Sequence, residues 1–270
     1  MSRFRSFIAC AILFCSFPLF AEQSDLSNAD KAAMQFAHDR GVDIYRYDQA
    51  AWHSTDALKE DITDLNNSGI VGWVTTKAEN GLKTTYWRPD KEGYRGVYSA
   101  IWTGTKTVDR RVLTDANNEL SREQKQMIEA FKLIDLNKIE RCKSSPFNLV
   151  TLPPDEQNGP ITVYLLTPQT ENKKYPLGGH YRFEVQNGKV KNQRKFMNSC
   201  FDMNLEQQKD NITPEIFFVT HSLDPFPTEI HVFSAISARI PIGVITIDNE
   251  YIWVIDGSNG EPKISRHDQP

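Results

Sequence analysis

The sequence lacks the short motifs that identify the common enzyme classes. Its 270 residues contain no G-x-G-x-x-G, no glycine-rich phosphate loop, no G-x-S-x-G, no H-E-x-x-H, no calcium-binding loop and no paired C-x-x-C. The sequence therefore does not favour a nucleotide-dependent enzyme, a zinc peptidase or a common α/β-hydrolase. Active sites also arise without a local signature, so the sequence leaves open whether the protein is an enzyme.

The sequence also lacks a strong charge of either sign and any compositional bias. The formal net charge is −4 and the isoelectric point is about 5.9. A nucleic-acid-binding surface normally needs a basic field, so no nucleic-acid partner is expected. Gly and Pro number 14 each, and 39% of the residues are hydrophobic. This composition excludes collagen-like and low-complexity chains and predicts a soluble globular protein.

Long apolar runs are absent after the first 21 residues. The single run, at 7–20, follows two arginines and precedes an alanine and a polar segment. A charged start, a short apolar stretch and a small exit residue predict a secretory signal peptide over 1–21 and a mature region over 22–270. A membrane span needs about 20 apolar residues, and Pro18 interrupts this run, so no stable span is expected. The predicted location is the periplasm or the external medium.

Cysteine is scarce, and two of the four cysteines belong to the predicted signal peptide. The remaining pair, Cys142 and Cys200, predicts a disulfide in an oxidising compartment. Such a bridge would stabilise the fold by about 4 kcal/mol in the chain-entropy treatment. The alternative makes Cys142 a nucleophile with His180 or His221 as its base. Cys142 follows a predicted helix, whose C-terminal dipole opposes a thiolate, so the disulfide is favoured.

Helical periodicity occurs in three segments. A capping-box pattern begins a helix over 29–38, which Gly41 is expected to end, and a second pattern covers 45–65. The clearest helix, over 121–139, begins with a second capping box. Between and after these helices, hydrophobic residues recur with a period of two, and Asn-Gly at 187–188 predicts a hairpin. The predicted strands are 71–75, 82–87, 94–103, 106–112, 148–152, 161–167, 180–185, 190–196, 216–221, 229–236, 242–247 and 251–255.

This order of elements predicts an α+β protein with antiparallel sheets and a long helix between two groups of strands. The two groups form either lobes over 22–115 and 145–270, joined by the helix at 121–139, or one extended sheet. No fixed repeat and no Gly/Ser-rich linker marks a boundary, so the number of domains stays open.

Polar side chains of two predicted strands suggest a candidate site. Tyr181, Phe183 and Val185 alternate toward the core, which leaves the polar residues between them on the other face. If the strand over 229–236 lies beside that face, acids and imidazoles of both strands converge. The candidate catalytic residues are His180, Glu184, His221, Asp224, Glu229 and His231.

Four of these residues, namely His180, His221, Glu229 and His231, carry side chains that suit a divalent metal. Such a metal, with one position open to water, would support hydrolysis. The alternative is that alternating polar residues form the solvated face of a sheet, in which His221 is a hydrogen-bonded strand-end residue. A register slip of one residue would also separate His221 from His231.

Aromatic residues are dense in the first half of the chain. Most should form core and cross-strand pairs, and a minority exposed in a groove would make a surface for a ligand or a partner. They are Tyr45, Tyr47, Trp52, Trp73, Tyr86, Trp87, Tyr94, Tyr98 and Trp102.

Several segments carry a resemblance to a known group. GPITVYLLTP at 159–168, YPLGGHYRF at 175–183, the KF and SC pairs within 195–200, THSLDPFPTEIHVF at 220–233 and the earlier segment 45–56 resemble exported proteobacterial proteins of unknown function. The resemblance implies a Gram-negative envelope or secreted setting and assigns no catalytic residues.

The sequence therefore predicts an exported α+β protein that binds a small ligand, an envelope component or another protein. One alternative is a metal-assisted hydrolase that uses the His/Glu cluster, and another is a periplasmic immunity or inhibitor protein. An enzyme should gather the candidate residues in one pocket. A binding protein should scatter them and expose aromatic side chains or an apolar groove instead.

Overall fold

The computed structural model describes residues 26–205, 215–249 and 251–267. The predicted signal peptide at 1–21 lies outside these residues. Over the described residues the chain is an α+β protein with mostly antiparallel sheets, as the sequence predicts. None of the described helices combines the length and the hydrophobicity that crossing a membrane requires.

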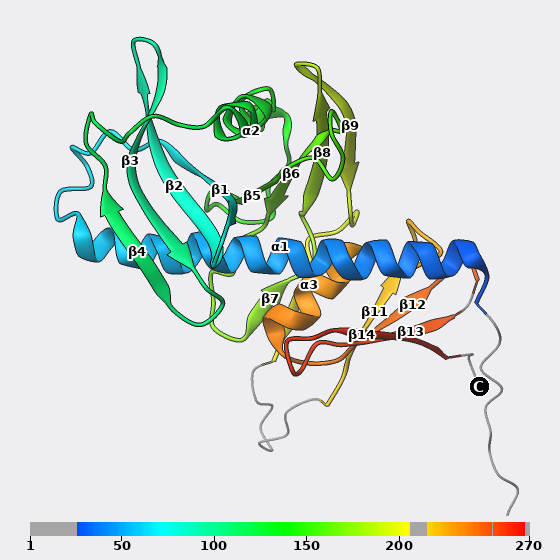
Figure 1. The fold of residues 1–270 in the computed structure, drawn as a ribbon. Coiled ribbons are helices and arrows are strands. Elements are labelled where there is room, and N and C mark those ends of the chain that lie inside the picture. The colour runs from blue at the N-terminus through cyan, green and yellow to red at the C-terminus, as the bar shows by residue number, and fades with distance from the viewer. Residues whose placement is uncertain (1–25, 206–214, 250, 268–270) are drawn as a thin grey trace, which may run out of the picture.

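A single long helix, α1 (Asn28–Asp61), runs across the whole structure (Figure 1). Its N-terminus is closed by the predicted capping box, in which Ser27 and Asp30 bond to each other's backbone N–H. The expectation that Gly41 ends a first helix is wrong, because Gly41 lies inside α1 where helix α3 (Glu229–Ala238) packs against it. A Cβ at position 41 would lie only 2.5 Å from the Cβ of Val232.

The four strands predicted between 71 and 112 are present and form an antiparallel meander in chain order, which packs on the C-terminal half of α1 (Figure 1). Tyr86 and Tyr98 from this sheet join Ala57 and Leu58 of α1 in one apolar cluster. Its strands are β1 (Gly72–Ala78), β2 (Gly81–Asp90), β3 (Gly93–Trp102) and β4 (Thr107–Val112).

A second antiparallel sheet lies between α2 (Arg122–Lys132) and α1 (Figure 1). The capping box that begins α2 is present, but the helix ends at Lys132 and not near 139; a short 3₁₀ turn, η1 (Leu136–Lys138), follows. The Asn-Gly hairpin at 187–188 is confirmed, with φ of 52° and 68°. The strands, in sheet order, are β5 (Asn148–Leu152), β6 (Ile161–Leu166), β8 (Tyr181–Gln186) and β9 (Lys189–Lys195).

The predicted disulfide is present between Cys142 and Cys200, whose Cα atoms are 5.4 Å apart. Cys142 lies in the loop after η1, away from any helix end of the described chain. Next to Cys200 a short two-stranded sheet forms from β7 (Lys174–Pro176) and β10 (Asp202–Asn204), neither of which the hydrophobic pattern predicts.

The last sheet contains a parallel pair, β11 with β12, and the connection between these two strands is α3. The predicted strand at 229–236 is therefore wrong, since a parallel pair requires a crossover and this segment supplies it. The segment is apolar almost all round and buried, so its hydrophobicity does not distinguish strand from helix. The strands of this sheet are β11 (Phe217–His221), β12 (Ile242–Thr246), β13 (Ile252–Asp256) and β14 (Lys263–His267).

Candidate functional site

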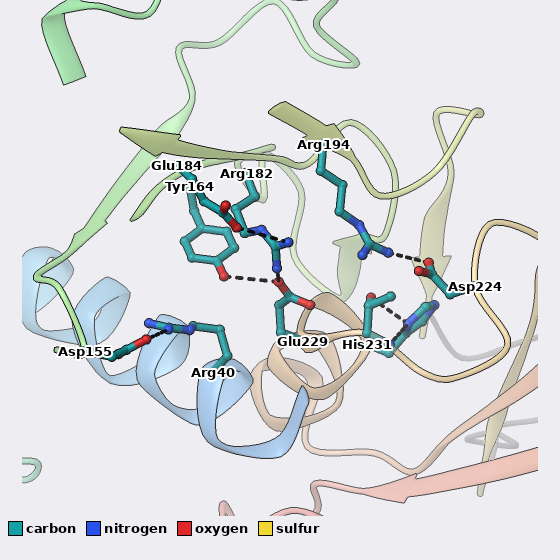
Figure 2. A network of polar contacts seen from close by, with 10 residues as sticks. Arg40, Asp155, Tyr164, Arg182, Glu184, Arg194, Asp224, Glu229 and His231 are labelled. Atoms are coloured by element: carbon teal, nitrogen blue, oxygen red, sulfur yellow. Dashed lines mark hydrogen bonds and ion pairs between the residues drawn. The ribbon is translucent and has the colours of Figure 1, made fainter. Parts of the chain in front are cut away.

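The candidate residues of the sequence fall into three separate places, and none of the three is a solvated sheet face. Glu229 and His231 lie in the first turn of α3, on a helix and not on a strand. Figure 2 shows the Glu229 carboxylate beside Tyr164 and Arg182 of the second sheet, whereas the His231 ring lies apart from them.

Glu229 forms a buried network with the second sheet. Its Oε1 accepts hydrogen bonds from the Tyr164 hydroxyl at 3.1 Å and from Nη1 of Arg182 at 2.6 Å. Arg182 also contacts Glu184 at 3.4 Å, so two predicted residues, Glu184 and Glu229, meet through this guanidinium. Glu229 is only 2% exposed. These contacts hold the N-terminus of α3 against β6 and β8, and we call the four residues the Glu229 network.

His231 belongs to a second group, which lies on the β9 side of α3 (Figure 2). Nδ1 of His231 accepts from the backbone N–H of Thr228 at 3.0 Å, which completes the cap of α3. The ring of His231 packs edge-on against His221, and Nε2 of His221 is 2.7 Å from Asp224, which also pairs with Arg194. Burial, followed by the charge of His221, lowers the pKa of His231 well below its usual value.

His180 lies apart from both groups and is fully buried. Its Nδ1 accepts from the backbone N–H of Thr167 at 3.2 Å, and its Nε2 donates to the carbonyl of Pro176 at 3.0 Å. Burial lowers the pKa of this ring to about 4. Since both nitrogens are used by the backbone, His180 holds the chain between β6, β7 and β8 in place.

The predicted metal ligands are therefore not gathered into one site. Over the described residues, no three His, Cys, Asp or Glu side chains lie together in a way that would hold a metal ion. Each predicted residue instead has a protein partner that fixes α3 or the second sheet. These contacts hold α3 in position through buried charge pairs and helix capping.

A groove of about 700 Å³ lies between α1 and α3, and we call it the α1–α3 groove. Its remaining walls come from β1, the start of β5, the end of β6 and β7. The lining residues are Tyr45, Asp48, Gln49, Ala51, Trp52, Thr55, Trp73, Asn148, Leu166, Thr167, Pro168, Gln169, Tyr175, Pro176, His180, Phe233, Ser234, Ser237 and Arg239.

Aromatic side chains dominate the accessible walls of this groove. Trp52 is 56% exposed, and Tyr45, Trp73, Tyr175 and Phe233 are half-buried around the same space. A large exposed indole leaves apolar surface in water, which costs free energy. Exposed aromatic surface gathered around a groove is typical of a binding site. The groove is therefore a strong candidate for a binding surface.

Two polar groups of the groove are unusual. The Ser234 hydroxyl is buried and has no hydrogen-bond partner among the described residues. The half-buried carboxylate of Asp48 has amide neighbours, with Nδ2 of Asn148 at 3.5 Å, and burial raises the pKa of Asp48 to about 6. Both groups would gain from a ligand that supplies the missing contacts.

A larger hollow, of about 1050 Å³, lies beside α2 and the turn between β8 and β9. Its lining contains no aromatic residue and is rimmed by the long charged side chains of Arg122, Lys125 and Glu129. Such side chains lose rotamer freedom when they close on a ligand. The α1–α3 groove is smaller but has rigid rings and buried polar groups, which favour it as the binding site.

Tyr45, Trp52 and Trp73 are among the aromatic residues for which the sequence predicts core or groove positions, and they line this groove. The strand expected at 229–236 gives no indication that Phe233 and Ser234 line it as part of α3. Asp48 showed no signal at all, since Asn148 is a hundred residues away in the chain.

No protein-family model matches the chain, and no curated protein matches it. The family of this chain is thus not assigned by similarity, and the groove alone guides its functional interpretation.

Proposed function

We propose that this chain is an exported binding protein of the bacterial envelope that takes a small organic molecule into the α1–α3 groove. The observation that carries the proposal is the groove itself, in which five aromatic side chains surround a volume of about 700 Å³. Small-molecule sites typically enclose about 300–1,000 Å³ and combine apolar walls with a few polar groups.

The separation of the candidate catalytic residues supports binding over hydrolysis. Glu229 is occupied by Arg182 and Tyr164, and both nitrogens of His180 are occupied by the backbone. Neither residue presents a free base or an open coordination position to the groove. What these contacts contribute is rigidity, because they fix the helix that carries Phe233 and Ser234.

Export rests on two features that agree with each other. The N-terminal charge and hydrophobicity pattern is that of a secretory signal peptide. The Cys142–Cys200 bridge is of the kind that persists in oxidising compartments. The periplasm or the external medium is therefore the proposed location.

The proposal is tested with the mature, disulfide-bonded protein and a library of soluble small organic cations, anions and neutral molecules. Ligand-observed NMR and tryptophan fluorescence report binding. We expect compounds whose affinity falls about 10-fold in Trp52→Ala and in Trp73→Ala, since a ring contact contributes about 1–1.5 kcal/mol.

Phe218→Ala is the matched control, because Phe218 is 51% exposed on β11 and does not line the groove. Its affinities should equal those of the unmodified protein. The proposal fails if no compound binds, or if every compound that binds is indifferent to both tryptophan substitutions.

A further inference from the structure

The charged groups that line the α1–α3 groove are few. Asp48 is the acid among the lining residues, and Arg239 is the arginine. Arg239 is exposed at the C-cap of α3, so water screens its charge. The imidazole of His180, also in the lining, is buried and hydrogen-bonded at both nitrogens. The least solvated charge that a ligand meets in the groove is therefore the carboxylate of Asp48.

Asp48 differs in its partners from three other acids that are buried or half-buried. Glu229 pairs with Arg182, Asp224 pairs with Arg194, and Asp202 pairs with a lysine at 2.5 Å. Among the described residues, Asp48 has no ion pair, and its neighbours are the amides of Asn148 and Gln49. A carboxylate removed from water without a counter-charge is costly, so the groove contains an uncompensated negative charge.

The rings around the groove have the complementary property. Tyr45, Trp52, Trp73, Tyr175 and Phe233 present aromatic surface to the same space. The face of an aromatic ring is electronegative and attracts a cation within about 6 Å, most strongly when the cation has lost water. Rings and a carboxylate thus favour the same ligand charge, whereas both disfavour an anion.

We infer, resting on the proposed function, that the ligand is a small organic cation: an amine with an apolar or aromatic body whose ammonium group lies beside Asp48. The rings hold the body and the polarised N–CH groups of the ligand. The ammonium supplies the counter-charge that the chain itself does not provide.

Matched probes of different charge test this inference by isothermal titration calorimetry at pH 7.5. One set is phenethylamine, 2-phenylethanol and phenylacetate, and the other is choline with its neutral analogue 3,3-dimethyl-1-butanol. Each cation should bind at least 10-fold more tightly than its neutral counterpart, and phenylacetate should bind most weakly. Asp48→Asn should reduce this preference about 10-fold, since only the rings then favour the cation, and should leave the affinity of the alcohols unchanged.

Asp43→Asn is the control variant, because Asp43 is also half-buried on α1 but does not line the groove. It should keep the full preference for cations. A second measurement needs no substitution: cation affinity should fall about 10-fold between pH 7.5 and pH 5 as Asp48 takes up a proton, and alcohol affinity should not change.

The outcomes separate this inference from the proposed function. If neutral or anionic probes, or neutral or anionic library compounds, bind best and still depend on Trp52, the groove is a binding site and the cation assignment is overturned. If cations bind equally well to Asp48→Asn, the assignment of the ammonium to Asp48 is overturned. If neither the probes nor the library yields a Trp52-dependent ligand, both proposals fail together.

Discussion

The buried carboxylates of this protein have two kinds of surroundings. Glu229 is held by a guanidinium and a phenol, so its charge is compensated within the fold. Asp48 is held by amides, so its charge opposes folding at neutral pH. A group that costs stability and faces a groove is typical of a site kept for function, because binding sites conserve groups that folding alone would not favour.

Asp48→Asn should therefore stabilise the ligand-free protein. The pKa of Asp48 is raised to about 6 in the folded state from an ordinary value near 3.8. The contribution of Asp48 to the free energy of unfolding therefore falls as the pH rises from about 4 to about 6, and it stays low above that. We expect a gain of about 1 kcal/mol at pH 7, discounted because the side chain is partly open to water.

Thermal unfolding at pH 7 measures this gain as an increase in Tm of about 2–4 °C. Asp56→Asn is the control, since Asp56 is exposed on the same helix and its loss should change stability by less than about 0.5 kcal/mol. A lower Tm for Asp48→Asn would show that the carboxylate supports the fold.

His180 predicts the opposite pH dependence. Burial lowers its pKa to about 4 in the folded state, whereas the unfolded chain takes up a proton near 6.5. The unfolded state thus binds the proton first as the pH falls, and stability should decrease between about pH 6.5 and pH 4, by on the order of 3 kcal/mol from this residue. His231 acts in the same direction.

Urea unfolding at a series of pH values measures that slope, and NMR of the imidazole protons identifies its source. The His180 resonances should remain those of a neutral ring at pH 5. A His180 titration midpoint near 6.5 would contradict the buried, neutral imidazole.

Residue-scale features were predictable where a local rule applied. The cysteine pair needed only the count and the compartment, and both capping boxes needed only a four-residue spacing. The partners of Asp48 and of His180 were not predictable, because they are set by contacts between distant segments. Single-sequence patterns carry no information about which distant segments meet.

At the scale of elements, the crossing of α1 and α3 determines the shape of the groove. The two helices approach so closely at Gly41 that a Cβ there would lie 2.8 Å from the carbonyl oxygen of Glu229. The glycine is needed for this approach and not for a turn. Phe233 and Ser234, which follow Val232 in α3, line the groove.

Gly41→Ala should consequently destabilise the protein even though alanine favours helices more than glycine does. The added methyl group would overlap Val232, which costs about 1–3 kcal/mol and moves α3 away from α1. Denaturant unfolding measures the loss. The alternative, a gain of about 1 kcal/mol from helix propensity, would mean that the helices separate without cost.

The Glu229 network predicts strong coupling between α3 and the second sheet. Glu229→Leu should destabilise by about 3–5 kcal/mol, because the buried Arg182 loses its 2.6 Å partner and keeps only the 3.4 Å contact with Glu184. The double variant Arg182→Met/Glu229→Leu should recover most of this loss, since neither charge remains. Urea unfolding of the two single variants and the double variant gives the coupling energy, and additive losses would contradict the pairing.

Most strands were predicted correctly, including the buried β6 and β12, and the segment that becomes α3 was not. The four strands predicted between 71 and 112 correspond to β1 to β4. Residues 229–238 are apolar on nearly all sides, and the choice of helix over strand is made by the parallel pairing of β11 and β12. That pairing forms across α3, so no local pattern could reveal it.

At the scale of the whole molecule, α1 is shared by several apolar clusters. Met34 and Ala37 pack with α3 and the last sheet, Ile44 and Tyr47 pack with the second sheet, and the end of the helix packs with the first sheet. One helix therefore connects all the larger sheets of the described structure (Figure 1). The groove lies at its middle, where these clusters meet.

The disulfide adds a second long-range connection, between the loop after η1 and the segment before β10. Cys142→Ser/Cys200→Ser should destabilise by about 4 kcal/mol, because the bridge closes a loop of 58 residues in sequence separation. Denaturant unfolding of the oxidised protein and of the double variant measures the difference. A loss below about 1 kcal/mol would contradict this expectation and show that the bridge has little effect on the fold.

The shared helix also has a consequence for biosynthesis. Gly41 leaves the ribosome about 190 residues before Val232, the residue that covers it, so the first part of α1, with Met34 and Ala37, lacks its packing partners for most of translation. We expect a nascent chain of this kind to bind a holding chaperone. Residues of its last hundred positions supply the packing partners of the first part of α1. The groove therefore forms late in synthesis, because its wall includes residues up to Arg239.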